Sequence, residues 1–134
     1  MLRRNAEGRY ADDQGRESES DEFPHGLYKH GGREYFDVLA LHTYGMPLSW
    51  SFIGRGARVR KIMDENGDAA KPLWNTEFGA SGEGIAQAWG IPKEDPVKSF
   101  DERQCDMLTG CMEFNKKAKI YSKYFVYAYH AGSE

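Results

Sequence analysis

Residues 71–79, KPLWNTEFG, and residues 35–45, YFDVLALHTYG, are the stretches that decide the fold. Both are short, mostly apolar runs that end at a glycine, a pattern typical of β-strands. Pro72 agrees with this interpretation because proline is tolerated at the first positions of a strand. The run 35–41 predicts a strand that is covered on both faces, and such strands are usually parallel. A third, buried strand is predicted over residues 124–129, YFVYAY.

Helical patterns separate these strands. A short helix is expected from Phe23 to Gly31, and a second over residues 51–66, where apolar side chains recur at a helical period. A longer amphipathic helix with lysines in its last turn is expected over residues 97–119, after a Gly- and Ser-rich loop. Strands that alternate with helices are joined by right-handed crossovers into parallel sheets. The sequence therefore predicts an α/β fold with about three parallel strands.

Length and composition limit the domain organisation. The chain has 134 residues, of which 40% are hydrophobic and 29% charged, and this suits one domain. A complete (β/α)8 barrel needs about 250 residues and is excluded. Residues 1–21 are polar and acidic, so a disordered segment or loop is expected there. The folded domain is expected over residues 22–134.

Net charge and hydropathy exclude several partners. The formal net charge is -3, so there is no basic field to attract nucleic acid. The chain contains no run of about 18 apolar residues that would predict a membrane span, and residues 1–8 lack the apolar core of a secretory signal. We therefore expect no nucleic acid and no membrane as partner. The expected location is cytoplasmic if Met1 is the genuine N-terminus, and is otherwise unknown.

Cys105 and Cys111 are the two cysteines of the chain. On one helix their Cα atoms lie about 9 Å apart, beyond the separation of about 7 Å that a disulfide can span. Neither the thiols nor the histidines have the spacing of a metal site. We therefore expect two packing thiols, or one that is partly exposed, and no metal and no cofactor.

Polar side chains stand at the carboxyl end of each predicted strand, where the ligands of parallel sheets bind. His42 and Tyr44 end the first strand, and Glu77 ends the second. Tyr129 and His130 end the third. A carboxylate beside a phenol and an imidazole can act as a base, or as a nucleophile toward an electrophilic carbon.

Strict alternation of side chains predicts the faces of the second strand. Asn75 and Glu77 are two residues apart, so they are expected to share a face. Trp74 is expected on the opposite face, packed under the helices.

Two segments of the chain resemble the retaining glycoside hydrolases of clan A, the (β/α)8 cellulases, mannanases, xylosidases and their relatives. Residues 35–45, with their His-x-Tyr end, are similar to the sixth barrel strand. Residues 64–79 are similar to the end of the sixth helix, its Gly-Asp turn and the seventh strand with its Thr-Glu-Phe-Gly end. From about Phe23 onward the order and spacing resemble the second half of the barrel. The resemblance implies a partial (β/α)8 TIM barrel that holds strands six to eight.

The resemblance also implies a function, the hydrolysis of O-glycosyl bonds with retention. Glu77 would be the catalytic nucleophile, Tyr44 would hydrogen-bond to it, and His42 would contact the substrate or the acid/base residue. Retaining hydrolysis uses two carboxyl groups about 5 to 5.5 Å apart, one as nucleophile and the other as acid and base. The expected substrate is an oligosaccharide or polysaccharide, on which aromatic rings stack. The side chains expected to contact it are Trp50, Trp89, Tyr129 and His130.

The chain departs from this family at the acid/base residue. In clan A that residue is the glutamate of an Asn-Glu pair at the end of strand four, and no Asn-Glu pair occurs here. Three strands also cannot close a barrel. We therefore expect the isolated chain to be inactive or nearly inactive on glycosides. Its expected partner is a missing half-barrel, or a second copy of the chain that associates through open sheet edges. The alternative is a small α/β protein that binds carbohydrate or another ligand without turnover.

Overall fold

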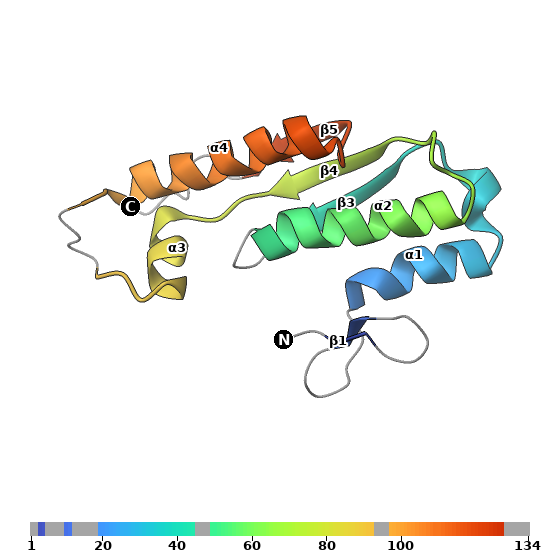
Figure 1. Cartoon of the computed structure of the whole chain (residues 1–134), viewed down its shortest axis with the longest axis horizontal. Helices are drawn as coiled ribbons and strands as arrows, with labels where there is room; N and C mark the ends of the chain where they lie inside the picture. The colour runs from blue at the N-terminus through green and yellow to red at the C-terminus, as the bar shows by residue number, and fades with distance from the viewer. Residues whose placement is uncertain (1–2, 5–9, 12–18, 45–48, 93–96, 128–134) are drawn as a thin grey trace.

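The structure is a computed structural model that describes residues 3–4, 10–11, 19–44, 49–92 and 97–127 (Figure 1). Helices and strands alternate along most of this length. The elements are β1 (Arg3–Arg4), β2 (Tyr10–Ala11), α1 (Glu19–Lys29), η1 (Gly32–Tyr35), β3 (Leu39–Thr43), η2 (Ser49–Gly54), α2 (Arg55–Glu65), β4 (Leu73–Phe78), α3 (Gly82–Ala88), α4 (Phe100–Ala118) and β5 (Lys123–Val126).

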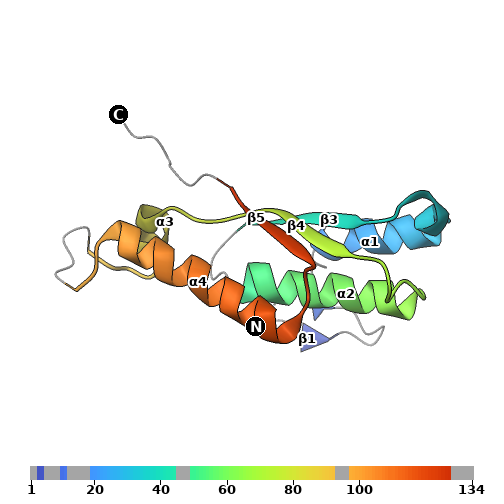
Figure 2. The same cartoon turned by 90° about the horizontal axis from the view of Figure 1, so that it is seen from above.

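The main sheet consists of β3, β4 and β5 in this order, and both neighbouring pairs are parallel. The short strands β1 and β2 form a separate antiparallel pair. The predicted α/β fold with three parallel strands is therefore confirmed. Helices α1, α2 and α4 lie on one side of the main sheet (Figure 2). Within the described part of the chain, the other face of the sheet is left open.

The core lies between the sheet and these helices. The ring centroids of Phe52 and Phe78 are 4.5 Å apart, and those of Phe52 and Tyr121 are 4.9 Å apart. Burying a large apolar side chain of this kind stabilises the fold by about 1.5–3 kcal/mol. The buried cluster is made of Leu39, Phe52, Val59, Met63, Leu73, Phe78, Cys111 and Tyr121.

Helix α4 is bounded by local signals in its sequence. The Ser99 hydroxyl accepts a hydrogen bond from the Glu102 N–H, and the Glu102 carboxylate accepts one from the Ser99 N–H, which makes a capping box. Lys119 ends the helix in the left-handed conformation, with φ 52°. Asn115 then ties the helix to the start of β5, because its side chain bonds both the N–H and the carbonyl of Tyr121 at 2.9 Å. The predicted long helix is confirmed.

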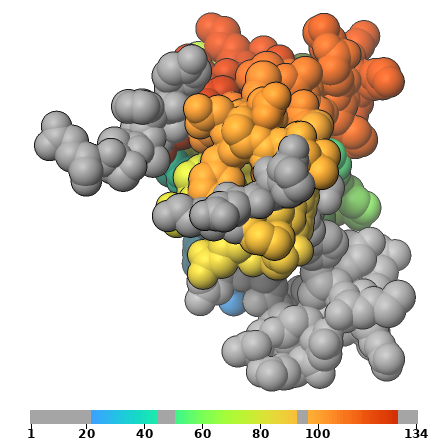
Figure 3. Space-filling model, turned by 90° about the vertical axis from the view of Figure 1, so that its left-hand side faces the viewer, coloured from blue at the N-terminus to red at the C-terminus, as the bar shows by residue number. Residues whose placement is uncertain are grey.

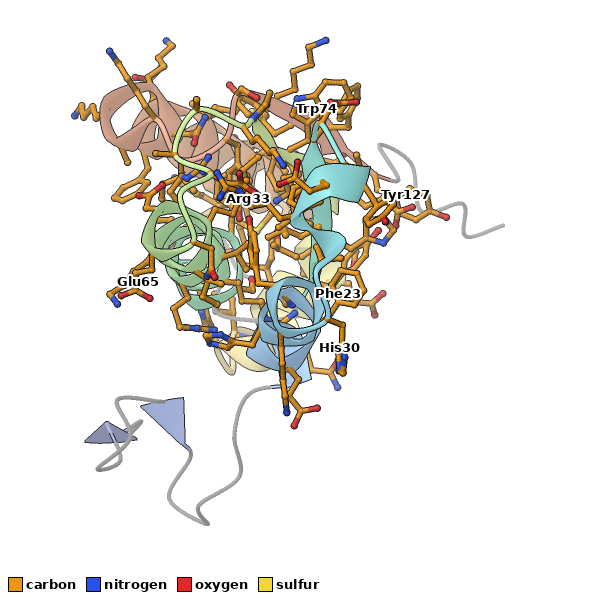
Figure 4. The ribbon with its side chains drawn as sticks, turned by 90° about the vertical axis from the view of Figure 1, so that its right-hand side faces the viewer. Phe23, His30, Arg33, Glu65, Trp74 and Tyr127 are labelled. Carbon is orange, nitrogen blue, oxygen red and sulfur yellow. The ribbon has the colours of Figure 1, made fainter. Side chains whose placement is uncertain are left out.

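A buried carboxylate joins α1, η1 and the turn before β4. Asp68 accepts hydrogen bonds from the Tyr28 hydroxyl at 2.9 Å and from Arg33 Nε at 3.1 Å, and Lys71 Nζ lies 3.2 Å away (Figure 4 labels Arg33). Desolvation opposes the ionisation of Asp68, but the hydrogen bonds from Tyr28, Lys71 and Arg33 outweigh it and hold the pKa of Asp68 below its ordinary value. Desolvation, followed by the bond to Asp68, raises the pKa of Tyr28 to about 12.

Strand β3 differs from its predicted position and burial. The sequence predicts a strand over residues 35–41, whereas the observed strand is Leu39–Thr43 and is preceded by η1. Leu39 and Thr43 are buried, but Ala40 and His42 are exposed. The expectation of a strand covered on both faces is wrong because the helices lie on one face.

Strand β5 and helix α3 also depart from the prediction. β5 alternates exposed and half-buried positions and is not a buried strand, and residues 128–129 of the predicted strand lie outside the described residues. The predicted loop after β4 contains α3. Ser81 caps this helix, because its side chain accepts a hydrogen bond from the Gly84 N–H. Ile85 and Ala86 are buried, and this burial together with the cap outweighs the low helix propensity of glycine. Figure 3 faces the end of the molecule where α3 packs against α4.

The faces of β4 differ from strict alternation after Asn75. Asn75 is fully buried on the helix side, whereas Glu77 lies opposite His42 on the open face. Trp74 also lies on the open face, where it contacts Phe125 and Lys123 and is not part of the core. The predictions that Asn75 and Glu77 share a face and that Trp74 packs under the helices are therefore wrong. The cause is a β-bulge at Thr76, described below.

Three further features concern the cysteines, the polar N-terminal segment and the length of the helices. Cys105 is exposed and Cys111 is buried, and both are free thiols on α4. Helix α1 begins at Glu19, inside the polar segment 1–21, and most of the residues before it lie outside the described ranges. None of the helices within the described ranges is long and apolar enough to span a membrane.

Candidate functional site

Glu77, Tyr44 and His42 meet at the carboxyl ends of β3 and β4. The Tyr44 hydroxyl donates a hydrogen bond to Glu77 Oε2 at 2.7 Å, and His42 Nδ1 lies 3.4 Å from the same oxygen. His42 and Glu77 are partners in the register of the two strands. The structure therefore brings together the three side chains that the sequence singles out for catalysis.

The phenol of Tyr44 is the hydrogen-bond donor in this cluster. Desolvation, followed by the hydrogen bond to the Glu77 carboxylate, raises the pKa of Tyr44 to about 12. The phenol thus keeps its proton at neutral pH and donates a hydrogen bond to Oε2. The side chain of Glu77 is 32% exposed, so a ligand on the open face of the sheet can reach its carboxylate.

Tyr127 is a fourth side chain at this site. The sequence places it near the end of the third predicted strand, but it is not among the predicted site residues. Its ring centroid lies 6.2 Å from that of Tyr44, edge to face, and the ring is exposed. In Figure 4 the labelled Trp74 and Tyr127 lie on the side of the sheet away from α2. The signal that could have found Tyr127 is its place directly after β5, which is the same strand-end position that singles out Tyr44.

A glycine allows β5 to bring Tyr127 to the site. The Tyr127 N–H donates to the Phe78 carbonyl at 3.0 Å, which continues the strand pairing beyond β5. A Cβ on Gly79 would lie 2.8 Å from the Tyr127 carbonyl oxygen, closer than side chains tolerate. The glycine that ends the KPLWNTEFG stretch therefore shapes the site as well as ending the strand.

Of the four predicted sugar contacts, Trp89 is the one whose side chain the structure describes. Trp89 follows the last residue of α3 and is exposed, and none of the described hydrogen bonds or ring contacts joins its side chain to Glu77. Trp50 lies in η2, but its side chain is outside the described part. Tyr129 and His130 lie outside the described residues.

An open cleft of about 340 Å³ adjoins the site along β3. Apolar side chains from α1, β3 and α2, including Phe23, Leu41 and Val59, line much of it. His42 and Arg55 also line it, so His42 borders both the cleft and Glu77.

The chemistry of the site is that of a carboxylate held by a phenol and an imidazole. Across the described ranges, no three His, Cys, Asp or Glu side chains gather in a group that could hold a metal ion. The carboxylate can act as a nucleophile or a base, and the exposed rings can stack on an apolar ligand face. No protein family, no curated protein and no solved structure matches the chain.

Proposed function

We propose that the chain carries the nucleophile of a retaining glycoside hydrolase, with β3, β4 and β5 as strands six to eight of a (β/α)8 barrel. The observation that supports this proposal is the hydrogen bond from Tyr44 to Glu77 at the carboxyl ends of two parallel strands, beside His42. Parallel α/β folds carry their active sites at these strand ends. An oriented, reachable carboxylate at this place suits attack on an anomeric carbon.

The two oxygens of Glu77 have different surroundings. Among the described residues, the hydrogen bond from Tyr44 and the contact with His42 both go to Oε2. Oε1 is therefore the oxygen that attacks. As its bond to the anomeric carbon forms, the glycosidic C–O bond breaks and its electron pair leaves with the aglycone oxygen. Water then gives a proton to the acid/base carboxylate and displaces Glu77 from the glycosyl ester, so two inversions give net retention.

The first step needs an acid when the leaving group is a sugar. A second carboxyl group about 5 to 5.5 Å from Glu77 protonates the departing oxygen in retaining enzymes. Since the chain has no Asn-Glu pair, we propose that a further barrel segment supplies this group. Natural glycosides then require that segment, whereas glycosides with a leaving group that needs no proton do not.

This difference gives the test of the proposal. The full chain is incubated with 2,4-dinitrophenyl 2-deoxy-2-fluoro-β-glycosides of glucose, mannose and xylose, whose phenolate leaves without protonation. Intact-mass spectrometry is expected to show the addition of one fluoroglycosyl group by at least one of the three. Glu77→Gln is expected to abolish the addition. Glu83→Gln is the matched control, because Glu83 is an exposed carboxylate at the start of α3, and it is expected to retain the addition.

Two outcomes contradict the proposal. Unchanged labelling in Glu77→Gln would assign the reaction to another residue. The absence of labelling by all three glycosides, in a chain shown to be folded, would mean that Glu77 is not a glycosyl acceptor.

A second candidate function, carbohydrate binding without turnover, is favoured by the exposed ring of Tyr127 beside Tyr44. Such a ring can stack on the apolar face of a sugar. In that case oligosaccharides would shift the NMR signals of Tyr127 equally in the unmodified chain and in Glu77→Gln, and no adduct would form.

A further inference from the structure

Strand β4 has one residue more than each of its neighbours between Asn75 and Phe78. Leu41 pairs with Asn75, but His42 pairs with Glu77, so no residue of β3 lies opposite Thr76 in the register. On the other side, Asn75 pairs with Tyr124 and Phe78 with Val126. Because the same step shifts the register against both neighbours, the extra residue belongs to β4.

This bulge decides where the Glu77 carboxylate lies. Leu73 and Asn75 are buried on the helix side, and uninterrupted alternation would put Glu77 on that side as well. The extra residue returns Phe78 to the helix side, where it is fully buried, and puts Glu77 beside His42. Without the bulge, the carboxylate would be buried away from Tyr44.

The side chain of Asn75 lies directly behind the bulge. Its amide is 2.6 Å from Thr43 Oγ1, and both residues are fully buried. The orientation that satisfies every group has Asn75 Oδ1 accepting from the Thr43 hydroxyl. Asn75 Nδ2 then donates to the Glu77 carbonyl at 2.8 Å and to the Leu41 carbonyl at 3.2 Å.

These two carbonyls belong to the residues around which the register shifts. A buried backbone carbonyl without a hydrogen-bond donor is unfavourable, so a bulge in a core needs side chains that supply donors. The Asn75 amide gives one N–H group to each carbonyl, and the Leu41 carbonyl also accepts a hydrogen bond from the Thr76 hydroxyl at 3.4 Å. The amide oxygen accepts a hydrogen bond from the Thr43 hydroxyl. The amide and hydroxyl therefore stabilise this strand conformation from the buried face.

We propose that Asn75 and Thr43 are positioning residues, which hold the bulge in β4 and so direct the Glu77 carboxylate toward Tyr44 and His42. Neither touches the open face of the sheet. The chemical role of Glu77 rests on the proposed function, but its orientation by Asn75 and Thr43 does not.

The experiment follows the Tyr44 phenol, which reports on its bond to Glu77. The full chain, with tyrosines labelled at 13Cζ, is titrated by NMR. Substitution of Thr43 by Val removes the hydroxyl at nearly constant volume, and Asn75→Leu removes the amide. The midpoint of each titration is the pKa of that tyrosine. Both substitutions are expected to lower the Tyr44 pKa from about 12 toward its ordinary value of 10.0, because the hydrogen bond to Glu77 is lost. Thr43→Ser keeps the hydroxyl and is expected to restore the midpoint.

Two controls separate positioning from general stability. Asn115→Leu removes a second buried asparagine, which bonds backbone groups of Tyr121 outside the cluster, and it is expected to leave the Tyr44 midpoint unchanged. The Tyr28 signal, whose midpoint depends on Asp68, is expected to stay near 12 in all the Thr43 and Asn75 variants. If Asn75→Leu does not fold, the Thr43→Val and Thr43→Ser pair still decides.

Two results would overturn the proposal. One is an unchanged Tyr44 midpoint in folded Thr43→Val. The other is an equal shift in Asn115→Leu, which would make the effect one of stability alone. The Tyr44 pKa could shift as expected in the Thr43 and Asn75 variants while no fluoroglycoside labels the chain. That outcome would support the positioning role and contradict the glycosidase proposal.

Discussion

The Tyr44 hydroxyl donates a hydrogen bond to Glu77 Oε2 at 2.7 Å, between residues that end two parallel strands and lie 33 positions apart in the chain. His42 Nδ1 lies 3.4 Å from the same carboxylate oxygen. Tyr127 in turn packs edge to face on Tyr44, at 6.2 Å between centroids. The orientation of Glu77 thus depends on side chains from all three strand ends.

Removing the phenol hydroxyl is expected to weaken the reactivity of Glu77 without unfolding the chain. In Tyr44→Phe the ring still packs against Tyr127, but Glu77 loses its donor. Misplacement of a reacting group slows a reaction on the order of tenfold to a hundredfold. The rate of labelling by the dinitrophenyl fluoroglycosides measures the loss, and the thermal midpoint serves as a control. An unchanged labelling rate would show that the hydrogen bond has no part in the reaction.

The close approach of β4 and β5 is expected to make Gly79 sensitive to substitution. A methyl group in Gly79→Ala would meet the Tyr127 carbonyl at 2.8 Å, and overpacking of this kind costs about 1–3 kcal/mol in the free energy of unfolding. Gly110 is the matched control, because it is an exposed helical glycine with no neighbour near its Cβ position. Gly110→Ala is expected to stabilise the chain by about 0.5–1 kcal/mol. Urea unfolding measures both, and equal effects would contradict the close approach.

The Asp68 network is expected to make stability depend on acidic pH. Since its hydrogen bonds hold the folded-state pKa of Asp68 below the unfolded value of about 3.9, ionised Asp68 stabilises the fold above that pH. This contribution is lost as the pH falls through the folded-state value. Asp68→Asn is therefore expected to lower the free energy of unfolding at pH 7 and to flatten its decline below about pH 4.

The exposed carboxylate of Asp106 offers the control for this prediction. Asp106 pairs with Lys98 at the surface, and Asp106→Asn is expected to change stability little at either pH. Parallel acid titrations of the two variants, followed by circular dichroism, measure the difference. Identical curves would mean that Asp68 does not stabilise the fold.

The order of the elements and the place of the site could be predicted from the sequence because both follow from local patterns. The apolar run 71–79 that ends at a glycine predicted β4 to within two residues at its start and one at its end. The rule that ligands bind at the carboxyl ends of parallel strands singled out His42, Tyr44 and Glu77. The faces of β4 could not be predicted, because alternation carries no signal of a bulge. The bulge is held by the buried Asn75 amide, which bonds Thr43 from another strand.

Other features depended equally on tertiary contacts. The glycines of α3 made the sequence predict a loop there. The helix forms because Ser81 caps it and Ile85 is buried. Trp74 is large and apolar, like many core residues. Because the helices cover one face of the sheet, it lies on the open face with Phe125. The burial of a strand depends on the elements that pack on its two faces, so it cannot be predicted from the residues of the strand alone.

The residue that bears the fluoroglycosyl group tests the central claim most directly. After labelling of the full chain by a 2,4-dinitrophenyl 2-deoxy-2-fluoroglycoside, proteolysis and fragment-ion mass spectrometry locate the adduct. The account predicts one ester, on Glu77. An adduct on any other residue, or none on a folded chain, would contradict it.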